Sequence, residues 1–330
     1  MNQPSRILAF LLAVLILTSC LEKDRKGLKP MVSGKPGEVL LVIDKYLWES
    51  AFGEYFVDLC SEPFEALPTD EPSYDLIHIP SSGFSKLFKS HRNIFITKIS
   101  SQYSEPKIIV QRDLWAYPQL VVNLVGPNNY SMISYLDENR EKLLNLLEVD
   151  ERNRNIQNYR KNRAKGIDEI LKTGHGVSVS VPIGYEMGLD TSDFIWLSHE
   201  VSDLTQGVLI YHYPYTDSNT FTVKYLIEKR NKFLRKFVPG PTKGSYMTTE
   251  SRYPVIQYEM AKNGSYLLEL RGLWKLENAF MGGPFLSHTV LDEKNNRVVT
   301  IEGFVYAPSR DKRGYVRELE AILQTFEVVD

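Results

Sequence analysis

Short runs of apolar and β-branched residues, separated by turns, follow one another from residue 37 onward. Residues 37–44 form an apolar run bounded by a glycine and a polar residue, which predicts a buried strand. Residues 48–60 place large apolar side chains at helical spacing, which predicts an amphipathic helix. Further strands are predicted over 74–79, 93–99, 107–111 and 119–125.

The second half of the chain has longer strand patterns. Residues 177–182 alternate strictly between apolar and polar, so they predict a strand with one buried face. Helical periodicity over 221–234 and 310–326 predicts two helices. The other strands are predicted over 194–197, 208–213, 255–260, 266–276, 286–291 and 297–306.

A highly charged stretch separates the two halves. It ends at glycines that suit the C-terminus of a helix. We therefore predict an N-terminal lobe over 37–148, a connecting charged helix over 149–175 and a C-terminal lobe over 176–330. The fold class is α+β, with two lobes that are each a mainly antiparallel sheet with helices packed on it.

The first twenty residues have a different pattern. Arg6 precedes an uninterrupted apolar run over 7–17, and Leu17-Thr18-Ser19-Cys20 follows. The run is too short to span a bilayer as a helix, which needs roughly 20 residues. It has the length of a signal peptide, which we predict over 1–19.

The end of this run resembles the bacterial lipobox: an aliphatic residue, two small residues and a cysteine. The resemblance implies cleavage between Ser19 and Cys20, and a diacylglycerol with further acylation, such as palmitate, on Cys20. Each buried CH₂ contributes about 0.8 kcal/mol, so two or three acyl chains give a durable anchor. An ordinary secretory signal, in which Cys20 is incidental, is the alternative.

A polar stretch over 20–36 follows and predicts a lipidated tether. Leu21, rather than aspartate, comes after the cysteine. By the usual sorting pattern this favours the outer membrane, and the choice between its periplasmic and surface faces stays open.

The composition is that of an ordinary globular protein, with 43% hydrophobic and 24% charged residues. The formal net charge of -2 argues against a general nucleic-acid binder. The chain has two cysteines, Cys20 and Cys60. Lipid on Cys20 leaves Cys60 without a disulfide partner in the chain, and we predict a buried position for it on the helix over 48–60.

Recognisable catalytic and cofactor motifs are absent from the sequence. It contains no H-E-x-x-H, no G-x-S-x-G, no phosphate loop and no G-x-G-x-x-G. The sequence therefore predicts no catalytic residue, no metal and no cofactor.

An aromatic and glycine-rich segment in the C-terminal half is the candidate for a ligand or partner groove. Glycines beside aromatic side chains can form the mobile rim of a groove. A second loop with aromatic residues would line the same groove if the two loops lie at one end of the sheet. The alternative is that the aromatic residues pack in the core and the glycines form a turn. The candidate residues are Arg271, Trp274, Phe280, Met281, Gly282, Gly283, Tyr213 and Tyr215.

Several stretches together resemble a known family. They are residues 34–40, 91–94, 213–217, 238–241, 244–250 and 270–285. Over essentially the whole mature chain, the sequence is similar to a family of Bacteroidetes lipoproteins classed as a domain of unknown function, numbered 4837. The resemblance implies a Gram-negative envelope lipoprotein and brings no known activity. Residues 176–330 also resemble the PsbP-type α/β/α fold, whose members act mainly as binding or assembly proteins.

We therefore expect a cell-envelope lipoprotein that is held to the membrane through Cys20. Its folded part is expected to be a non-enzymatic binding or assembly module for another envelope protein, a cell-wall component or a lipid component. Nucleic acid is not an expected partner. The alternatives are a structural tether and an envelope hydrolase without a recognisable motif. The hydrolase requires a nucleophile and a base, or two carboxylates, in one cleft.

Overall fold

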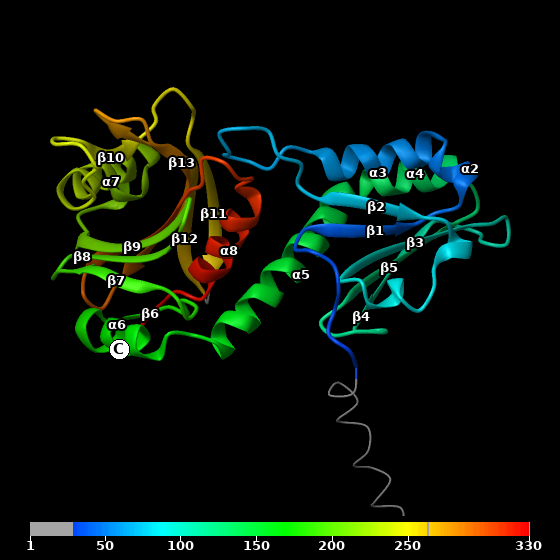
Figure 1. Ribbon diagram of the computed structural model, residues 1–330, viewed down its shortest axis with the longest axis horizontal. Coiled ribbons are helices and arrows are strands. Elements are labelled where there is room, and N and C mark those ends of the chain that lie inside the picture. The colour runs from blue at the N-terminus through cyan, green and yellow to red at the C-terminus, as the bar shows by residue number, and fades with distance from the viewer. Residues whose placement is uncertain (1–28, 263, 330) are drawn as a thin grey trace, which may run out of the picture. The chain divides into compact units, whose positions relative to one another are not determined.

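The computed structural model describes residues 29–262 and 264–329. The predicted signal peptide, the cleavage site at Ser19 and Cys20, and the first part of the predicted tether lie outside the described residues. The chain divides into two compact units (Figure 1). The N-terminal lobe takes the described residues of Met1–Cys60 together with Tyr74–Asp150, and the C-terminal lobe takes Ser61–Ser73 and the described residues of Glu151–Asp330.

The N-terminal lobe contains a five-stranded sheet in the order β2-β1-β3-β5-β4. Its strands are β1 (Glu38–Val42), β2 (Asp75–Ile79), β3 (Asn93–Ile99), β4 (Lys107–Arg112) and β5 (Leu120–Gly126). The strands β2, β1, β3 and β5 are parallel, and only β4 is antiparallel, to β5. The prediction of a mainly antiparallel sheet is therefore wrong for this lobe. A crossover through α3 (Ala51–Ser61) returns the chain after β1, so β2 starts at the same edge as β1.

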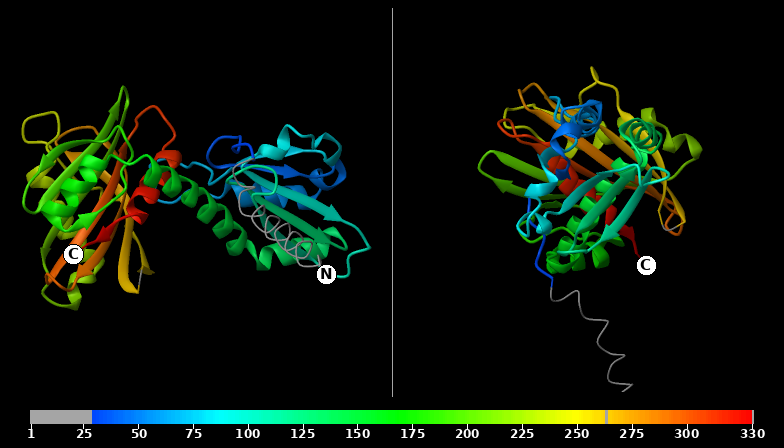
Figure 2. Two further views of the ribbon diagram at one scale, coloured as in Figure 1. Left: turned by 90° about the horizontal axis from the view of Figure 1, so that it is seen from below. Right: turned by 90° about the vertical axis from the view of Figure 1, so that its right-hand side faces the viewer.

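Helices cover one face of the N-terminal sheet. The helices α3, α4 (Asn129–Glu138) and the first half of α5 (Arg140–Lys161) pack there (Figures 1 and 2). Cys60 lies in this core at 2% exposure, as predicted, and burial raises the pKa of its thiol to about 12. Loops with short 3₁₀ turns, η2 (Ser81–Gly83) and η3 (Phe88–Ser90), contribute aromatic side chains to the other face.

The C-terminal lobe is built on an eight-stranded sheet in the order β10-β12-β13-β14-β9-β8-β7, with β11 also paired to β12. All of these pairs are antiparallel, which confirms the prediction for this lobe. The strands are β7 (Glu186–Asp190), β8 (Phe194–Val201), β9 (Leu204–Pro214), β10 (Tyr246–Thr249), β11 (Ile256–Lys262), β12 (Ser265–Glu277), β13 (Gly282–Asp292) and β14 (Arg297–Tyr306). The short β6 (Val177–Ser178) pairs with β15 (Glu327–Val328) in a separate ladder.

Helices lie on both faces of the C-terminal sheet. Alternate residues of β9 separate the two cores: Leu209 and Tyr211 pack towards α7 (Val223–Phe237), while Val208 and Ile210 pack towards α8 (Arg313–Gln324). Figure 1 shows the sheet between these two helices. The α+β class is thus confirmed, and this lobe has the helix–sheet–helix order that the PsbP-type resemblance implies.

Two connecting segments differ from a simple linker. The charged stretch over 149–175 is divided between the second half of α5 and a separate helix, α6 (Lys165–His175). The proline-rich residues 61–73 belong to the C-terminal lobe, where Phe64 and Leu67 pack against the core that contains α8. Within the described parts of the chain, no helix is both long and apolar enough to cross a bilayer.

Candidate functional site

The residues predicted to form a groove lie on both faces of the C-terminal sheet. Trp274 is 2% exposed, packs towards α7, and donates its Nε1–H to the Val305 carbonyl at 3.1 Å. Arg271 lies on the other face, where it binds Glu320 of α8. The two are three positions apart on one strand, so their side chains point to opposite faces.

The two predicted loops also lie at opposite ends of the sheet. Gly282 and Gly283 pair with Lys275 and Trp274 at the first end of β13, next to Phe280 and Met281. The other end of β13 leads through a turn to β14, and Tyr215 there donates its backbone N–H to the Asn296 carbonyl. Tyr213 lies on that same end of β9. The expectation that these loops share one groove is therefore wrong.

The glycines have a packing role. A Cβ added at Gly283 would lie 2.1 Å from the carbonyl oxygen of Val305, so any larger residue would push the backbone apart. Phe280 is fully exposed at the turn, and Met281 packs partly against the core. The pair thus allows a close approach of backbones, and the alternative interpretation of Trp274 as a core residue agrees with the structure.

A cluster of charged side chains, which we call the α8 ion cluster, lies between the sheet and α8. Arg271 Nε is 2.6 Å from Glu269 Oε1, and Arg271 Nη1 is 2.5 Å from Glu320 Oε1. His288 Nε2 is 2.8 Å from Glu269 Oε2. Glu269 and Arg271 come from β12, His288 from β13 and Glu320 from α8.

Glu269 and Arg271 keep their charges despite burial. Burial alone would raise the pKa of Glu269, but the hydrogen bond to His288 and the charge of Arg271 lower it to about 2. Burial alone would lower the pKa of Arg271, but Glu320 and Glu269 together raise it. The charged forms of Glu269 and Arg271 are thus the stable forms, and the bond from Arg271 to Glu320 holds α8 to the sheet.

Tyr258 and Glu65 extend the cluster towards the edge of the sheet. The Tyr258 hydroxyl donates to the Glu65 carboxylate, and the Arg271 guanidinium lies 5.9 Å from the centre of the Tyr258 ring. Burial and Glu65 raise the pKa of Tyr258 to about 12. Residues 61–73 therefore contribute a side chain to this network.

A carboxylate bound to a histidine is also the geometry of a catalytic base with its orienting group. His288, however, has no exposed surface, and its Nδ1 has no hydrogen-bond partner in the described residues. A substrate therefore cannot reach this nitrogen in the folded lobe. The geometry therefore supports a structural role.

Helix α7 is held to the opposite face by a second buried ion pair. Arg230 binds the Glu302 carboxylate with Nε at 2.9 Å and Nη2 at 2.7 Å, and its Nη1 donates to Thr249 Oγ1 at 2.8 Å. The guanidinium also stacks 3.7 Å from the centre of the Phe285 ring. Every nitrogen of this guanidinium thus has a partner inside the lobe.

A small hollow lies beside the C-terminus of α8. It has a volume of about 200 Å³, and Lys262, Ser265, Val290, Leu291, Phe326, Glu327 and Val328 line it. Lys262 Nζ donates to the carbonyls of Gln324 and Phe326 at 2.6 and 2.7 Å, and burial lowers its pKa to about 8. Pockets for drug-sized ligands measure roughly 300–1,000 Å³, so this hollow is small for such a ligand.

The sequence marks Arg271 as a candidate but does not identify the side chains that bind it. Glu269 is two positions away on the same strand, a spacing that places both side chains on one face. His288 and Glu320 come from elements that sequence spacing does not connect. No group of three or more His, Cys, Asp or Glu side chains in the described part of the chain is placed to hold a metal.

Three solved structures illustrate the structural similarities. The Ran-binding protein Mog1p of Saccharomyces cerevisiae is 12% identical, with a TM-score of 0.31, over 48% of this chain and 92% of that one. LpqN of Mycobacterium tuberculosis, described as involved in cell-envelope biogenesis, is 10% identical, with a TM-score of 0.30, over 47% and 83%. A protein from Bacteroides thetaiotaomicron is 13% identical, with a TM-score of 0.22, over 48% and 46%. These TM-scores are too low to carry a fold or function to this chain.

No curated protein sequence matches the chain. Two family models match, each in one half of the chain. The sequence resemblance to a single family over the whole mature chain is therefore found as two families, one for each half. Residues 32–160 match the domain of unknown function DUF8532. Residues 164–325 match the domain of unknown function DUF4837, which confirms the resemblance to that family over the C-terminal lobe.

Proposed function

We propose that this protein is a lipid-anchored lipoprotein of the cell envelope and that its C-terminal lobe is a non-enzymatic binding or assembly module. The observation that carries the anchor is Leu17-Thr18-Ser19-Cys20 after an apolar run of signal-peptide length. Leu21 after the cysteine favours the outer membrane.

The buried charged groups of the C-terminal lobe hold its helices in place, which favours a binding module over a hydrolase. The α8 ion cluster and the Arg230–Glu302 pair hold helices on the sheet, and His288 is fully buried. In the hollow beside α8, the Lys262 amine donates to the carbonyls of Gln324 and Phe326, so it too is used to hold the end of a helix. A hydrolase needs a nucleophile and base that a substrate can reach.

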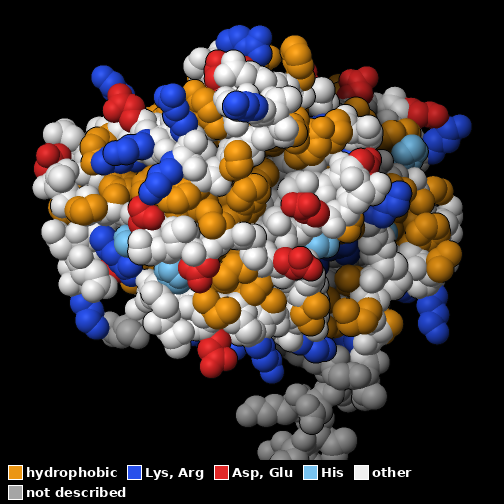
Figure 3. Space-filling view, turned by 60° about the vertical axis from the view of Figure 1, so that its left-hand side comes forward, with side chains coloured by type: hydrophobic (Ala, Val, Ile, Leu, Met, Phe, Trp, Pro, Cys, Tyr) orange, Lys and Arg blue, Asp and Glu red, His pale blue; other side chains and the backbone are white. Residues whose placement is uncertain are grey.

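One strand of the C-terminal lobe suits an extended partner. β11 pairs with β12 in unbroken register over seven residues, and no described strand pairs with its other side. Such an edge offers backbone N–H and C=O groups to a strand of another protein. On the face that Figure 3 shows, basic and acidic side chains are interspersed with hydrophobic ones, without the continuous basic field that is typical of a nucleic-acid-binding surface.

The anchor is tested by the Cys20→Ser precursor in cells that are fed a labelled fatty acid. We expect this variant to lose the label and to leave the membrane fraction. Cys60→Ser is the matched control and should keep both, because Cys60 is buried in the N-terminal core. Label retained by Cys20→Ser would contradict the anchor.

The binding role is tested by photo-crosslinking in living cells from position 257, which is exposed on β11. We expect one specific envelope partner, and we expect Met260→Pro, which disturbs the edge, to reduce its yield. Crosslinking from the exposed position 224 on α7 is the control. The absence of any specific partner at position 257 would count against the binding role of β11.

A further inference from the structure

Three loops meet at one edge of the N-terminal sheet, where the parallel strands β1, β3 and β5 begin. They are residues 29–37, 84–92 and 113–119. Bridges Met31–Tyr117 and Ser33–His91 join the first loop to the other two, and the Val32 N–H donates to the Tyr117 carbonyl at 3.1 Å. The first described residues of the chain are therefore fixed to this edge.

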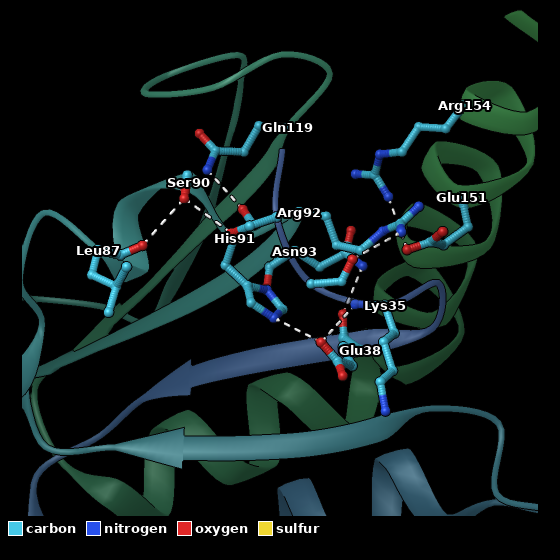
Figure 4. A network of polar contacts seen from close by, with 12 residues as sticks. Lys35, Glu38, Leu87, Ser90, His91, Arg92, Asn93, Gln119, Glu151 and Arg154 are labelled. Atoms are coloured by element: carbon cyan, nitrogen blue, oxygen red, sulfur yellow. Dashed lines mark hydrogen bonds and ion pairs between the residues drawn. The ribbon is translucent and has the colours of Figure 1, made fainter. Parts of the chain in front are cut away.

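Buried polar side chains fix the loops in place (Figure 4). Gln119 donates from Nε2 to the carbonyls of Lys89 and His91 at 2.7 and 2.8 Å, and its Oε1 accepts from the Trp115 N–H at 2.9 Å. His91 Nε2 lies 3.3 Å from Glu38 Oε2. Together these bonds make one ordered surface of the three loops, which we call the amino-edge surface.

The amino-edge surface exposes apolar side chains among basic ones. Met31 is 72% exposed, Leu87 76% and Leu114 36%. The same three loops contain five basic residues, Lys29, Lys35, Lys86, Lys89 and the buried Arg92, and one acidic residue, Asp113. This balance differs in sign from the formal net charge of -2 of the whole chain.

The length of chain before Lys29 limits what this surface can meet. Lys29 lies nine positions after Cys20. These nine steps span at most about 32 Å when the chain is fully extended. This step rests on the proposed lipid anchor: if Cys20 carries acyl chains, the amino-edge surface is held within that distance of the bilayer. A short tether gives an effective concentration in the millimolar range, so a weak contact is sufficient.

We propose that the amino-edge surface lies on an anionic phospholipid surface. Met31, Leu87 and Leu114 then enter the headgroup region, and the exposed Lys35 and Lys86 contact lipid phosphates. Isolated apolar side chains among lysines fit a lipid interface, because such an interface needs no complementary shape. The contact orients the lobe that the acyl chains confine.

The test uses the full lipidated protein in vesicles of phosphatidylethanolamine and phosphatidylglycerol. An environment-sensitive dye is attached at Leu87→Cys and, as the matched control, at Tyr130→Cys. Tyr130 is 87% exposed in the same lobe, at the start of α4, just after the opposite end of β5. The native Cys60 is buried and thus protected from the dye.

We expect the dye at position 87 to shift to the blue and to be quenched by spin-labelled lipid several-fold more than the dye at position 130. The double variant Lys35→Glu with Lys86→Glu should reduce quenching at position 87 severalfold, and so should vesicles of phosphatidylcholine alone. Equal quenching at the two positions would overturn the proposal. So would quenching at position 87 that is unchanged by the two lysine-to-glutamate substitutions.

The acyl mass of Cys20 and the flotation of the protein with vesicles report the anchor separately. Protein that is acylated and floats, but whose dye at position 87 stays in water, rejects the amino-edge surface and leaves the proposed function intact. Protein without acyl groups rejects the anchor, and with it the tether on which this proposal depends.

Discussion

Glu71 caps helix α8 from 241 positions earlier in the chain: its carboxylate oxygens lie 2.8 and 2.9 Å from the backbone N–H of Lys312. The Arg313 N–H donates to the same carboxylate at 2.8 Å. These N–H groups lie at the start of a helix, where no carbonyl of the preceding turn is available to them. At the other end, Lys262 donates to the last carbonyls, so both ends of α8 are satisfied by side chains from outside the helix.

Glu71→Gln should lower the free energy of unfolding by about 1–2 kcal/mol, since the amide keeps the shape but loses the charge next to the helix N-terminus. Urea unfolding followed by circular dichroism measures this. Asp70→Asn is the control, because Asp70 is exposed. Equal effects of the two substitutions would show that the cap adds nothing to stability.

Removing one member of the buried Arg230–Glu302 pair should be costly. Arg230→Met leaves Glu302, which has no exposed surface, without its cation, so we expect a loss of about 3–5 kcal/mol. Replacing Glu302 by Leu in the same protein should restore a large part of that loss, because no uncompensated charge remains. The two variants and the double variant are compared by urea unfolding, and full additivity of the single effects would contradict this account.

The α8 ion cluster makes stability depend on pH at the acidic end. The pKa of Glu269 is lowered from 4.5 to about 2 in the folded state, so the unfolded chain binds the proton first. The stabilisation is complete above about pH 4.5, is lost as the pH falls towards 2, and is on the order of 3 kcal/mol. The difference in unfolding free energy between the wild type and Glu269→Gln should shrink by this amount as the pH falls from 5 to 2, and parallel curves would rule it out.

Gly34 sits where the first loop turns onto the amino-edge surface. Its φ is +90°, and an added Cβ would lie 2.6 Å from His91 Nε2. Gly34→Ala should therefore cost more than about 1 kcal/mol. It should also reduce lipid quenching of a dye at position 87. Thermal unfolding measures the stability change, and Gly83→Ala, whose Cβ would meet nothing closer than 3.6 Å, should be nearly neutral in it. A neutral Gly34→Ala would mean that the loop is not fixed there.

The positions of most strands could be predicted, because apolar runs and turn residues mark them locally. Strand direction could not be predicted in the N-terminal lobe. The run before Asp44 is apolar on both faces, as is typical of parallel strands, but nothing in it specifies a neighbour. The assignment of residues 61–73 to the C-terminal lobe could not be predicted either. The prolines predict only a loop, and the positions of Phe64 and Glu71 depend on partners far along the chain.

The residues of the candidate site could also be predicted only in part. Arg271 stands out in the sequence, but its role is set by His288 and Glu320, which only the folded sheet brings to it. The sequence leaves Gly283 open to two interpretations, a mobile rim and a tight turn, because glycine is permissive. In the fold its lack of a side chain makes room for the Val305 carbonyl. A glycine alone does not distinguish flexibility from close packing.

The central claim is that this chain is held to a membrane by lipid on one cysteine. Mass spectrometry of the N-terminal peptide from protein isolated from native membranes tests it most directly. We predict a mature chain that begins at residue 20, with a diacylglycerol on the Cys20 sulfur and a further acyl chain on its amino group. An unmodified cysteine, or a mature terminus at any other residue, would contradict the claim.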